Sequence, residues 1–255
     1  MREDVESTID CVAAAPHAPL PTYYADKEQR REYLTTIFDN TAADYDRIER
    51  VLALGSGAWY RKKALVRAGL QHGMRVLDVG VGTGLLTKEA VRIVGDAALL
   101  TGIDPSVGMM KNARVPKGVV LLKGRAEDIP MENASVDFVT MGYALRHVDD
   151  LLTAFSSFHR VLKPSGRLCL LEITRPEYGI ARALLKLYLR GVIPAIARLV
   201  SDSRETARLF RYYWDTIDAC APPAQILETL RAAGFRDVRR QVTFGIFSEY
   251  QAIRC

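Results

Sequence analysis

The loop that follows a short apolar strand near residue 80 constrains this chain more than any other feature. Three glycines stand there at every second position: Gly80, Gly82 and Gly84. Glycine lets the backbone turn tightly and approach a ligand closely, because it has no Cβ. Twenty residues further on, Asp104 ends a second apolar run, residues 98–103. A carboxylate there is placed to accept hydrogen bonds from a ribose, so these features together predict a site for an adenosine-bearing cofactor.

The glycine spacing distinguishes this site from other nucleotide sites. A dinucleotide site has the pattern G-x-G-x-x-G, whose third small residue lets the helix pack closely on the strand. Leu85 occupies that third place here, and the extra glycine comes one residue earlier. A Walker loop needs Gly-Lys-Ser or Gly-Lys-Thr, whereas two leucines follow Gly84. The remaining pattern, D-x-G-x-G-x-G from Asp78, is that of class I S-adenosylmethionine methyltransferases. The alternative interpretation of this loop is a glycine-rich turn that binds no ligand.

Composition limits the class of protein further. A chain of 255 residues with 49% hydrophobic residues can bury a large core. Charged residues interrupt every apolar run and the N-terminus lacks a secretory signal, so we expect a cytoplasmic protein. The four cysteines form no C-x-x-C pair, which indicates neither a metal site nor a disulfide framework. The net charge of +5 is spread along the chain, so no nucleic-acid partner is expected.

The hydrophobic pattern divides the chain into an arm and one folded domain. Residues 1–22 are rich in alanine and proline, which predicts a mobile N-terminal arm. Residues 23–255 predict a single α/β, Rossmann-like domain, because strands and helices alternate as in a doubly wound, mostly parallel seven-stranded sheet. The expected parts of this domain are an N-terminal helical cap at 23–70, a cofactor-binding core at 71–175, a helical lid insertion at 179–219, and a C-terminal helix with a strand hairpin at 222–255.

The same pattern assigns individual elements. In the cap we expect one helix around Tyr33, a second that begins near Ala42, and a third after Gly57. In the lid we expect a helix from Ile180 to Val200, kinked at Pro194. The other expected elements are strands 74–79, 98–103, 118–123, 136–141, 167–173, 236–244 and 246–254, and helices 84–94, 106–113, 150–162, 204–219 and 222–233.

Several motifs occur in an order typical of one enzyme family. They are Tyr45-Asp46, Trp59-Tyr60-Arg61, Leu77 to Gly84, Gly102 to Ser106 with Met109, Gly124 to Pro130, Leu145 to Val148, Arg160 to Pro164 and Leu171 to Pro176. In these motifs the chain resembles the UbiE/MenG-type methyltransferases, which methylate a ring carbon in ubiquinone and menaquinone synthesis. The resemblance covers about residues 36–250. The chain departs from the family at Arg125, where Asp or Asn is usual, at His147, where Asn is usual, and over residues 211–217.

The resemblance implies that the cofactor is S-adenosylmethionine, with S-adenosylhomocysteine as its product. Asp104 would accept hydrogen bonds from the ribose hydroxyls, and Asp78 would anchor either the glycine loop or the methionine ammonium group. Tyr45 and Trp59 would either close the site from the cap or pack as ordinary aromatic side chains. The predicted cofactor-binding residues are Asp78, Gly80, Gly82, Gly84, Asp104, Pro105, Met109, Ala126, Glu127 and Tyr45.

The adenine side of the site has two open assignments. Met109 and Ile129 would either sandwich the adenine ring or belong to the core. Because Arg125 replaces the family's usual residue, adenine recognition falls to the backbone of Ala126 and to the neighbouring carboxylates, including that of Glu127.

Arg146 and His147 are the predicted catalytic residues. They follow the fourth strand, whose carboxyl end faces the ligand crevice in an open α/β sheet. If the acceptor is a phenol or hydroquinone, removing its proton makes a ring carbon or oxygen nucleophilic. His147, titrating near neutrality, would be the general base, and Arg146 would hold the phenolate. The alternative is that His147 caps the helix that starts near Asp149 and that Arg146 pairs with a carboxylate.

The expected function is methyl transfer from S-adenosylmethionine to a small apolar aromatic acceptor, a quinol, phenol or related secondary metabolite, with C-methylation favoured. A lipid-headgroup N-methyltransferase and a non-catalytic cofactor-binding accessory protein are the alternatives. The lid, with apolar residues punctuated by basic ones, would line a tunnel for a tail, rest peripherally on a membrane, or simply pack. A homodimer is a further expectation.

Overall fold

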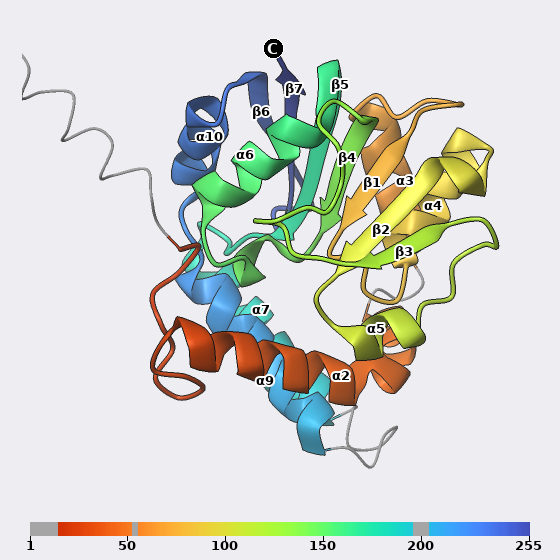
Figure 1. Ribbon diagram of the computed structural model, residues 1–255. Helices are drawn as coiled ribbons and strands as arrows, with labels where there is room; N and C mark the ends of the chain where they lie inside the picture. Colours follow the sequence, from red (N-terminus) through yellow and green to blue (C-terminus); the bar gives the residue numbers. More distant parts are fainter. Residues whose placement is uncertain (1–14, 53–55, 196–203) are drawn as a thin grey trace, which may run out of the picture.

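The computed structural model describes residues 15–52, 56–195 and 204–255, and a seven-stranded sheet is the central element (Figure 1). The strand order is β3-β2-β1-β4-β5-β7-β6. β1 to β5 are parallel to one another, whereas β7 is antiparallel to β5 and β6. The strands are β1 Val76–Val79, β2 Leu100–Asp104, β3 Val120–Lys123, β4 Val136–Gly142, β5 Leu162–Ile173, β6 Phe235–Thr243 and β7 Phe247–Arg254. The predicted doubly wound, mostly parallel sheet is confirmed.

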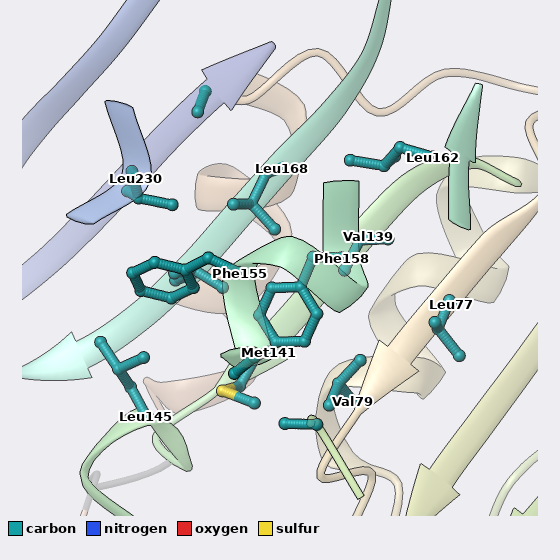
Figure 2. Close-up of a cluster of buried hydrophobic side chains, with 14 of the residues drawn as sticks. Leu77, Val79, Val139, Met141, Leu145, Phe155, Phe158, Leu162, Leu168 and Leu230 are labelled. Carbon is teal, nitrogen blue, oxygen red and sulfur yellow. The ribbon is translucent and has the colours of Figure 1, made fainter. Parts of the chain in front are cut away.

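Helices cover both faces of the sheet. The covering helices are α3 (Gly57–Arg67) and α4 (Leu85–Val94) on one face, and α6 (Leu151–Val161) and α10 (Pro223–Ala232) on the other. Because both faces are covered, β1 is buried at every position. The larger core lies under α6, where Phe155 and Phe158 meet Leu168 of β5 and Leu230 of α10 (Figure 2).

Local hydrogen bonds set several element boundaries. The first residues of predicted strand 98–103 belong to a 3₁₀ turn, η1 (Ala97–Leu99), because the Asp96 side chain accepts a 2.9 Å hydrogen bond from the Ala98 N–H. α5 (Val107–Lys111) starts at Ser106, whose hydroxyl oxygen accepts from the Met109 N–H at 3.0 Å. In the same way, Asp150 caps α6 by accepting from the Thr153 N–H at 2.7 Å.

The cap differs from its prediction. α2 (Lys27–Leu52) is one continuous helix, so the expectation of two separate helices with a start near Ala42 is wrong. The helix continues through the polar stretch, where the Thr41 hydroxyl donates to the Ile37 carbonyl at 2.6 Å, because Ile37, Phe38 and Tyr45 on either side of it pack in one cluster with α9. α2 packs against α5 and α9 beyond the carboxyl ends of the parallel strands (Figure 1). It therefore covers the edge of the sheet where the cofactor site is predicted.

The lid consists of α7 (Gly179–Leu187), a π-helical turn η3 (Tyr188–Val192) and α9 (Arg204–Ala219). The π turn comes directly before Pro194, which has no N–H to continue the regular helical hydrogen bonds. The helix continues through residue 195, and the remaining residues of the predicted helix, 196–200, lie outside the described part of the chain.

The first described residues, 15–22, pack against the domain, although they were predicted to belong to a mobile arm of residues 1–22. The Pro16 carbonyl accepts a 2.6 Å hydrogen bond from the Ala221 N–H. His17 is buried and lies 3.3 Å from the guanidinium of Arg30 in α2. This end of the predicted arm is therefore held between α2 and α9, and residues 1–14 lie outside the described part of the chain.

Candidate active site

A cavity of about 1210 Å³, including its open mouth, lies at the carboxyl ends of β1, β2 and β4. Its walls come from α2, the glycine loop, the loop at 124–127, η2 (Leu145–His147), and Tyr213 of α9. Carboxyl ends of parallel strands are where open α/β sheets bind ligands. The cavity wall combines the strand ends and the glycine loop with side chains of the cap and the lid, so one cavity joins the predicted cofactor side to the predicted acceptor side.

Asp104, at the end of β2, lines the cavity and holds the glycine loop. Its Oδ2 accepts from the Gly82 N–H and its Oδ1 from the Ser106 N–H, each at 2.8 Å. Burial raises the pKa of Asp104 to about 6, even though these two N–H groups oppose the shift. Each carboxylate oxygen keeps a lone pair for a ligand hydroxyl. The chain's own residues thus fit the ribose of S-adenosylmethionine.

Two glycines of the loop are required for different reasons. Gly80 lines the cavity with a φ of 69°, and a Cβ there would lie 2.8 Å from the Cβ of Ala144. Gly84 has a φ of 83° and stands before α4, where a Cβ would collide with Val115. Gly84 is not among the described residues that line the cavity. Its contribution is to the packing of the loop, whereas Gly80 and Gly82 face the ligand space.

Asp78 lies in β1 behind the loop and not in the cavity wall. Its Oδ2 accepts a 2.5 Å hydrogen bond from the Thr87 hydroxyl of α4, while its Oδ1 has no partner among the described residues. Burial, with a smaller contribution from the charge of Asp104, raises the pKa of Asp78 to about 7. This geometry favours the loop-bracing alternative over contact with the methionine ammonium group.

On the adenine side, the predicted residues that line the cavity are Pro105, Met109, Ala126 and Glu127. Ile129, by contrast, is buried in the core and does not reach the described cavity wall. Met109 is brought there by α5, whose first turn is held by Asp39 of α2. Asp39 Oδ1 accepts from the Gly108 N–H at 2.9 Å and from the Ser106 hydroxyl. Asp39 was missed by sequence reasoning, because it belongs to no motif and lies far from α5 in the chain.

Arg146 is not in the cavity wall but is buried beneath it. Its Nη1 donates to Glu172 Oε1 at 2.5 Å and to the Tyr143 carbonyl at 2.9 Å. Its Nε donates to the Thr216 hydroxyl of α9 at 3.2 Å, and its guanidinium lies 4.8 Å from the ring centre of Tyr213. The guanidinium therefore joins the sheet to the lid and is not free to hold a phenolate. The ion pair with Glu172 agrees with the alternative interpretation, in which Arg146 pairs with a carboxylate.

His147 does line the cavity, on the acceptor side. Its ring lies edge-on to Phe38 at 5.3 Å and is stacked on Tyr212 at 5.7 Å. Neither ring nitrogen has a hydrogen-bond partner in the described part of the protein. Since Asp150 caps α6, the alternative of His147 as a helix cap is wrong.

The electrostatic surroundings of His147 differ from the prediction. Burial and the positive charges of Arg146 and Arg30 lower its pKa well below 6.5, so the expectation of titration near neutrality is wrong. The imidazole is neutral through the physiological range, and one of its two buried ring nitrogens keeps an unshared electron pair.

Two tyrosines from the cap and the lid meet at the cavity. The hydroxyls of Tyr45 in α2 and Tyr213 in α9 lie 3.3 Å apart. Trp59, the other predicted closing residue, is exposed and does not line the described cavity. Tyr213 was not predicted as a site residue, although it stands in an aromatic run of the lid. Arg61 was missed as well, and its guanidinium lies in the wall, held by Glu49 at 2.6 Å.

Comparisons with known proteins agree with this geometry. The sequence model of the ubiE/COQ5 methyltransferase family matches residues 25–254. A demethylmenaquinone methyltransferase of Staphylococcus aureus strain JH9 is 32% identical over 230 residues, which are 87% of this chain and 93% of the relative. The homologue in strain MRSA252 is 34% identical over 186 residues, 71% of this chain and 77% of the relative.

Solved structures share the fold at lower identity. A S-adenosylmethionine-dependent methyltransferase from Thermotoga maritima has a TM-score of 0.61 at 21% identity and covers 87% of this chain and 100% of its own. The [4+2]-cyclase SpnF has a TM-score of 0.62 at 17% identity and covers 88% of this chain and 96% of its own. In the described residues, no helix combines the length and the apolar character needed to cross a membrane. The cofactor half of the cavity, the sheet order and the extent of the family match lead to one conclusion: the chain belongs to the ubiE/COQ5 methyltransferase family and is an S-adenosylmethionine-dependent methyltransferase.

Proposed function

We propose that this enzyme methylates a ring carbon of a quinol-type aromatic acceptor. The observation that carries the proposal is the unpartnered imidazole of His147 in a cavity wall rich in aromatic side chains. A hydroxylated ring suits this surface, because its face packs on aromatic side chains while its hydroxyl meets the hydroxyls of Tyr45 and Tyr213. The Staphylococcus aureus relatives, which are named for demethylmenaquinone, support the same class of acceptor.

The chain's part in the reaction is to orient two molecules and to move protons. S-adenosylmethionine, when bound, supplies an electrophilic methyl group. Asp104 and the backbone of Gly80 and Gly82 would hold its ribose and amino-acid end. The acceptor ring would lie beside His147 on the opposite side of the cavity.

His147 is neutral and would accept a proton from the acceptor hydroxyl once its ring turns one of its buried nitrogens toward the acceptor. Its lowered pKa makes it a weaker base than a free imidazole, so the acceptor hydroxyl must become acidic for the proton to move. That hydroxyl becomes more acidic as the ring carbon attacks, because ring electrons enter the new carbon–carbon bond. The methylated carbon then loses its hydrogen to water at the cavity mouth, while His147 returns its proton to the oxygen. One proton leaves in total, and the aromatic ring is restored.

The hydroxyl pair of Tyr45 and Tyr213 would bind the second oxygen of the acceptor. Burial raises the pKa of both phenols, so they remain protonated and donate hydrogen bonds. A quinol with an apolar tail is dissolved in a bilayer. We therefore propose that the protein acts in the cytoplasm at a membrane surface.

The test is a methylation assay with the purified chain, S-adenosylmethionine and separate acceptors: a demethylated naphthoquinol, simple phenols, and phosphatidylethanolamine. We expect the naphthoquinol to gain one methyl group, assigned to a ring carbon by NMR. Methylation of the lipid amine would instead make the protein a headgroup methyltransferase. Cofactor binding without any methylated product would identify an accessory protein, and either outcome overturns the proposal.

The role of His147 is tested with matched variants. His147→Ala should lower kcat about a hundredfold, within the range typical of a lost proton acceptor, with little change in cofactor affinity. His147→Asn keeps a hydrogen-bond acceptor and should retain part of the activity. His72→Ala, at an exposed turn, serves as the control. Equal kcat values in His147→Ala and His72→Ala would remove His147 from the mechanism.

A further inference from the structure

The outward face of the first lid helix is unusually apolar for a protein surface. Tyr178 and Ile180 are 80% exposed, and Leu184 and Leu187 are 62% exposed. Tyr188 and Val192 extend the same exposed set along η3. Scattered exposed hydrophobic residues are ordinary, but a contiguous apolar stripe marks an interaction surface. We call this set of six residues the α7 face.

The opposite side of α7 is partly buried through Leu185, and burial becomes complete further along, at Leu189 of η3 and at Ile193. Leu185 and Leu189 pack with Trp214 and Ile217 of α9, and Ile193 is buried with the aromatic side chains of the cap. The α7 face is therefore not the packing side of the helix, and packing within the described domain does not account for it.

The segment that carries the α7 face is itself basic, although Glu177 precedes it and two acidic residues of α9 pair with its arginines. Between Tyr178 and Val192 there are three basic residues and no acidic residue: Arg182, Lys186 and Arg190. Asp218 accepts two 3.0 Å hydrogen bonds from Arg182, and Asp215 lies 3.5 Å from Arg190, yet both arginines stay half-exposed. No described acidic residue pairs with Lys186. An apolar stripe bordered by basic side chains fits the boundary between headgroups and acyl chains of an anionic bilayer.

A second copy of the chain fits this face less well. Standard protein interfaces bury about 800 Å² on each partner. The α7 face, from Tyr178 to Val192, rises about 21 Å at 1.5 Å per residue, and a stripe one helix wide over that length is small for such an interface. A bilayer needs no complementary shape and accepts a narrow stripe.

We propose that the α7 face docks the enzyme on anionic membranes, with Ile180, Leu184 and Leu187 inserted and Arg182 and Lys186 at the lipid phosphates. This inference rests on the proposed function, since an acceptor with an apolar tail resides in the bilayer. The docking helix is one helix layer from the cavity: α7 packs on α9, and α9 carries Tyr213 into the cavity wall (Figure 1). A tailed acceptor would thus leave the bilayer next to the lid.

The test is flotation of the full chain with vesicles of phosphatidylcholine alone or mixed with phosphatidylglycerol, without any methyl acceptor. The wild-type protein should float with the anionic vesicles. The variant Ile180→Ser/Leu184→Ser/Leu187→Ser should bind at least tenfold less, because each buried side chain contributes strongly. Lys186→Gln should bind about fivefold less, as expected for one basic residue at an anionic surface.

The control is Val66→Ser/Val120→Ser, which removes exposed apolar side chains from α3 and β3 and should bind vesicles like the wild type. Wild-type protein that does not float, or a triple variant that floats equally well, overturns the docking proposal. A triple variant that changes only from dimer to monomer in sedimentation overturns it as well and identifies a second copy as the occupant.

The two proposals fail separately. Vesicle binding without methylation of any quinol would overturn the proposed function and leave docking standing. Turnover of a tail-free quinol without vesicle binding would overturn the docking proposal and leave the proposed function standing. All three substituted side chains are exposed, so the triple variant should keep wild-type turnover on the tail-free quinol, which also verifies its fold.

Discussion

The guanidinium of Arg146 and the carboxylate of Glu172 form a 2.5 Å ion pair in which both side chains are only 2% exposed. The pair joins the carboxyl ends of β4 and β5, and Arg146 extends it to Thr216 of the lid. A buried pair of this kind is costly to break, because the remaining charge stays desolvated. The cavity floor and the lid thus depend on one electrostatic contact.

Removing one partner should destabilise the protein strongly. We expect Glu172→Gln to lower the free energy of unfolding by roughly 3–5 kcal/mol, because the Arg146 charge is left unpaired. Urea unfolding followed by circular dichroism measures the change. Arg236→Ala breaks an exposed pair with Asp237 and should cost at most about 1 kcal/mol. Similar losses in the two variants would show that the buried pair contributes no more than a surface one.

Asp104→Asn should weaken binding of S-adenosylhomocysteine at least about tenfold, since an amide has one acceptor oxygen where the carboxylate has two. The affinity of the wild-type protein should also fall as the pH drops below about 6, where Asp104 becomes protonated. Titration calorimetry at several pH values measures both effects. Asp237→Asn, at an exposed bulge of β6, is the control. An affinity independent of both the substitution and pH would exclude Asp104 from ribose binding.

Gly80→Ala should lower both the stability of the protein and its affinity for the cofactor, and the loss of stability should exceed the cost of backbone strain alone. Gly80 and Gly245 have similar φ angles, 69° and 72°, but only at Gly80 would a Cβ meet a neighbour, Ala144. Gly245→Ala should therefore cost about 1–2 kcal/mol of conformational strain and leave cofactor affinity unchanged. Gly80→Ala should cost more and lower the affinity. Thermal unfolding and calorimetry distinguish the two variants, and identical behaviour would contradict the proposed close approach at Gly80.

Stability should depend on two buried histidines below pH 6.5. Burial and Arg30 lower the pKa of His17 to about 4, and burial and Arg146 lower that of His147 well below 6.5. As pH falls through 6.5, these histidines take up protons in the unfolded state but not in the folded state, so acid destabilises the fold. Each contributes up to about 1.4 kcal/mol per pH unit in this window.

The measurement compares wild-type protein with His17→Gln/His147→Asn between pH 7 and 5. The raised pKa values of Asp78 and Asp104 act in the opposite direction, but they are common to both proteins and cancel in the difference. We expect the variant to lose less stability on acidification. Parallel pH profiles would mean that the two imidazoles are not held neutral by the fold.

The cofactor half of the site could be predicted because its information is local in the chain. Gly80, Gly82 and Asp104 are brought together by a turn and a strand end that neighbouring residues define. The acceptor half depends on contacts between distant segments. Glu172 lies 26 residues from Arg146, and Tyr213 lies 168 residues from Tyr45, so no motif links either pair.

The chemical state of a residue is even less visible in a sequence. Placing His147 at the cavity from its position after β4 was correct, but its lowered pKa arises from burial, from its neighbour Arg146 and from Arg30, a residue of the distant helix α2. The continuity of α2 was missed for a related reason, since the residues on either side of its polar stretch pack against α9. Tertiary surroundings decided both cases.

Asp39 has a consequence for the order and strength of ligand binding. Through Gly108 and Ser106 it ties α2, the cover of the acceptor space, to α5, the wall beside the adenine. A ligand that fixes the position of α5 should therefore also fix that of α2. Because such coupling is reciprocal at equilibrium, cofactor and acceptor should each raise the affinity of the other by the same factor.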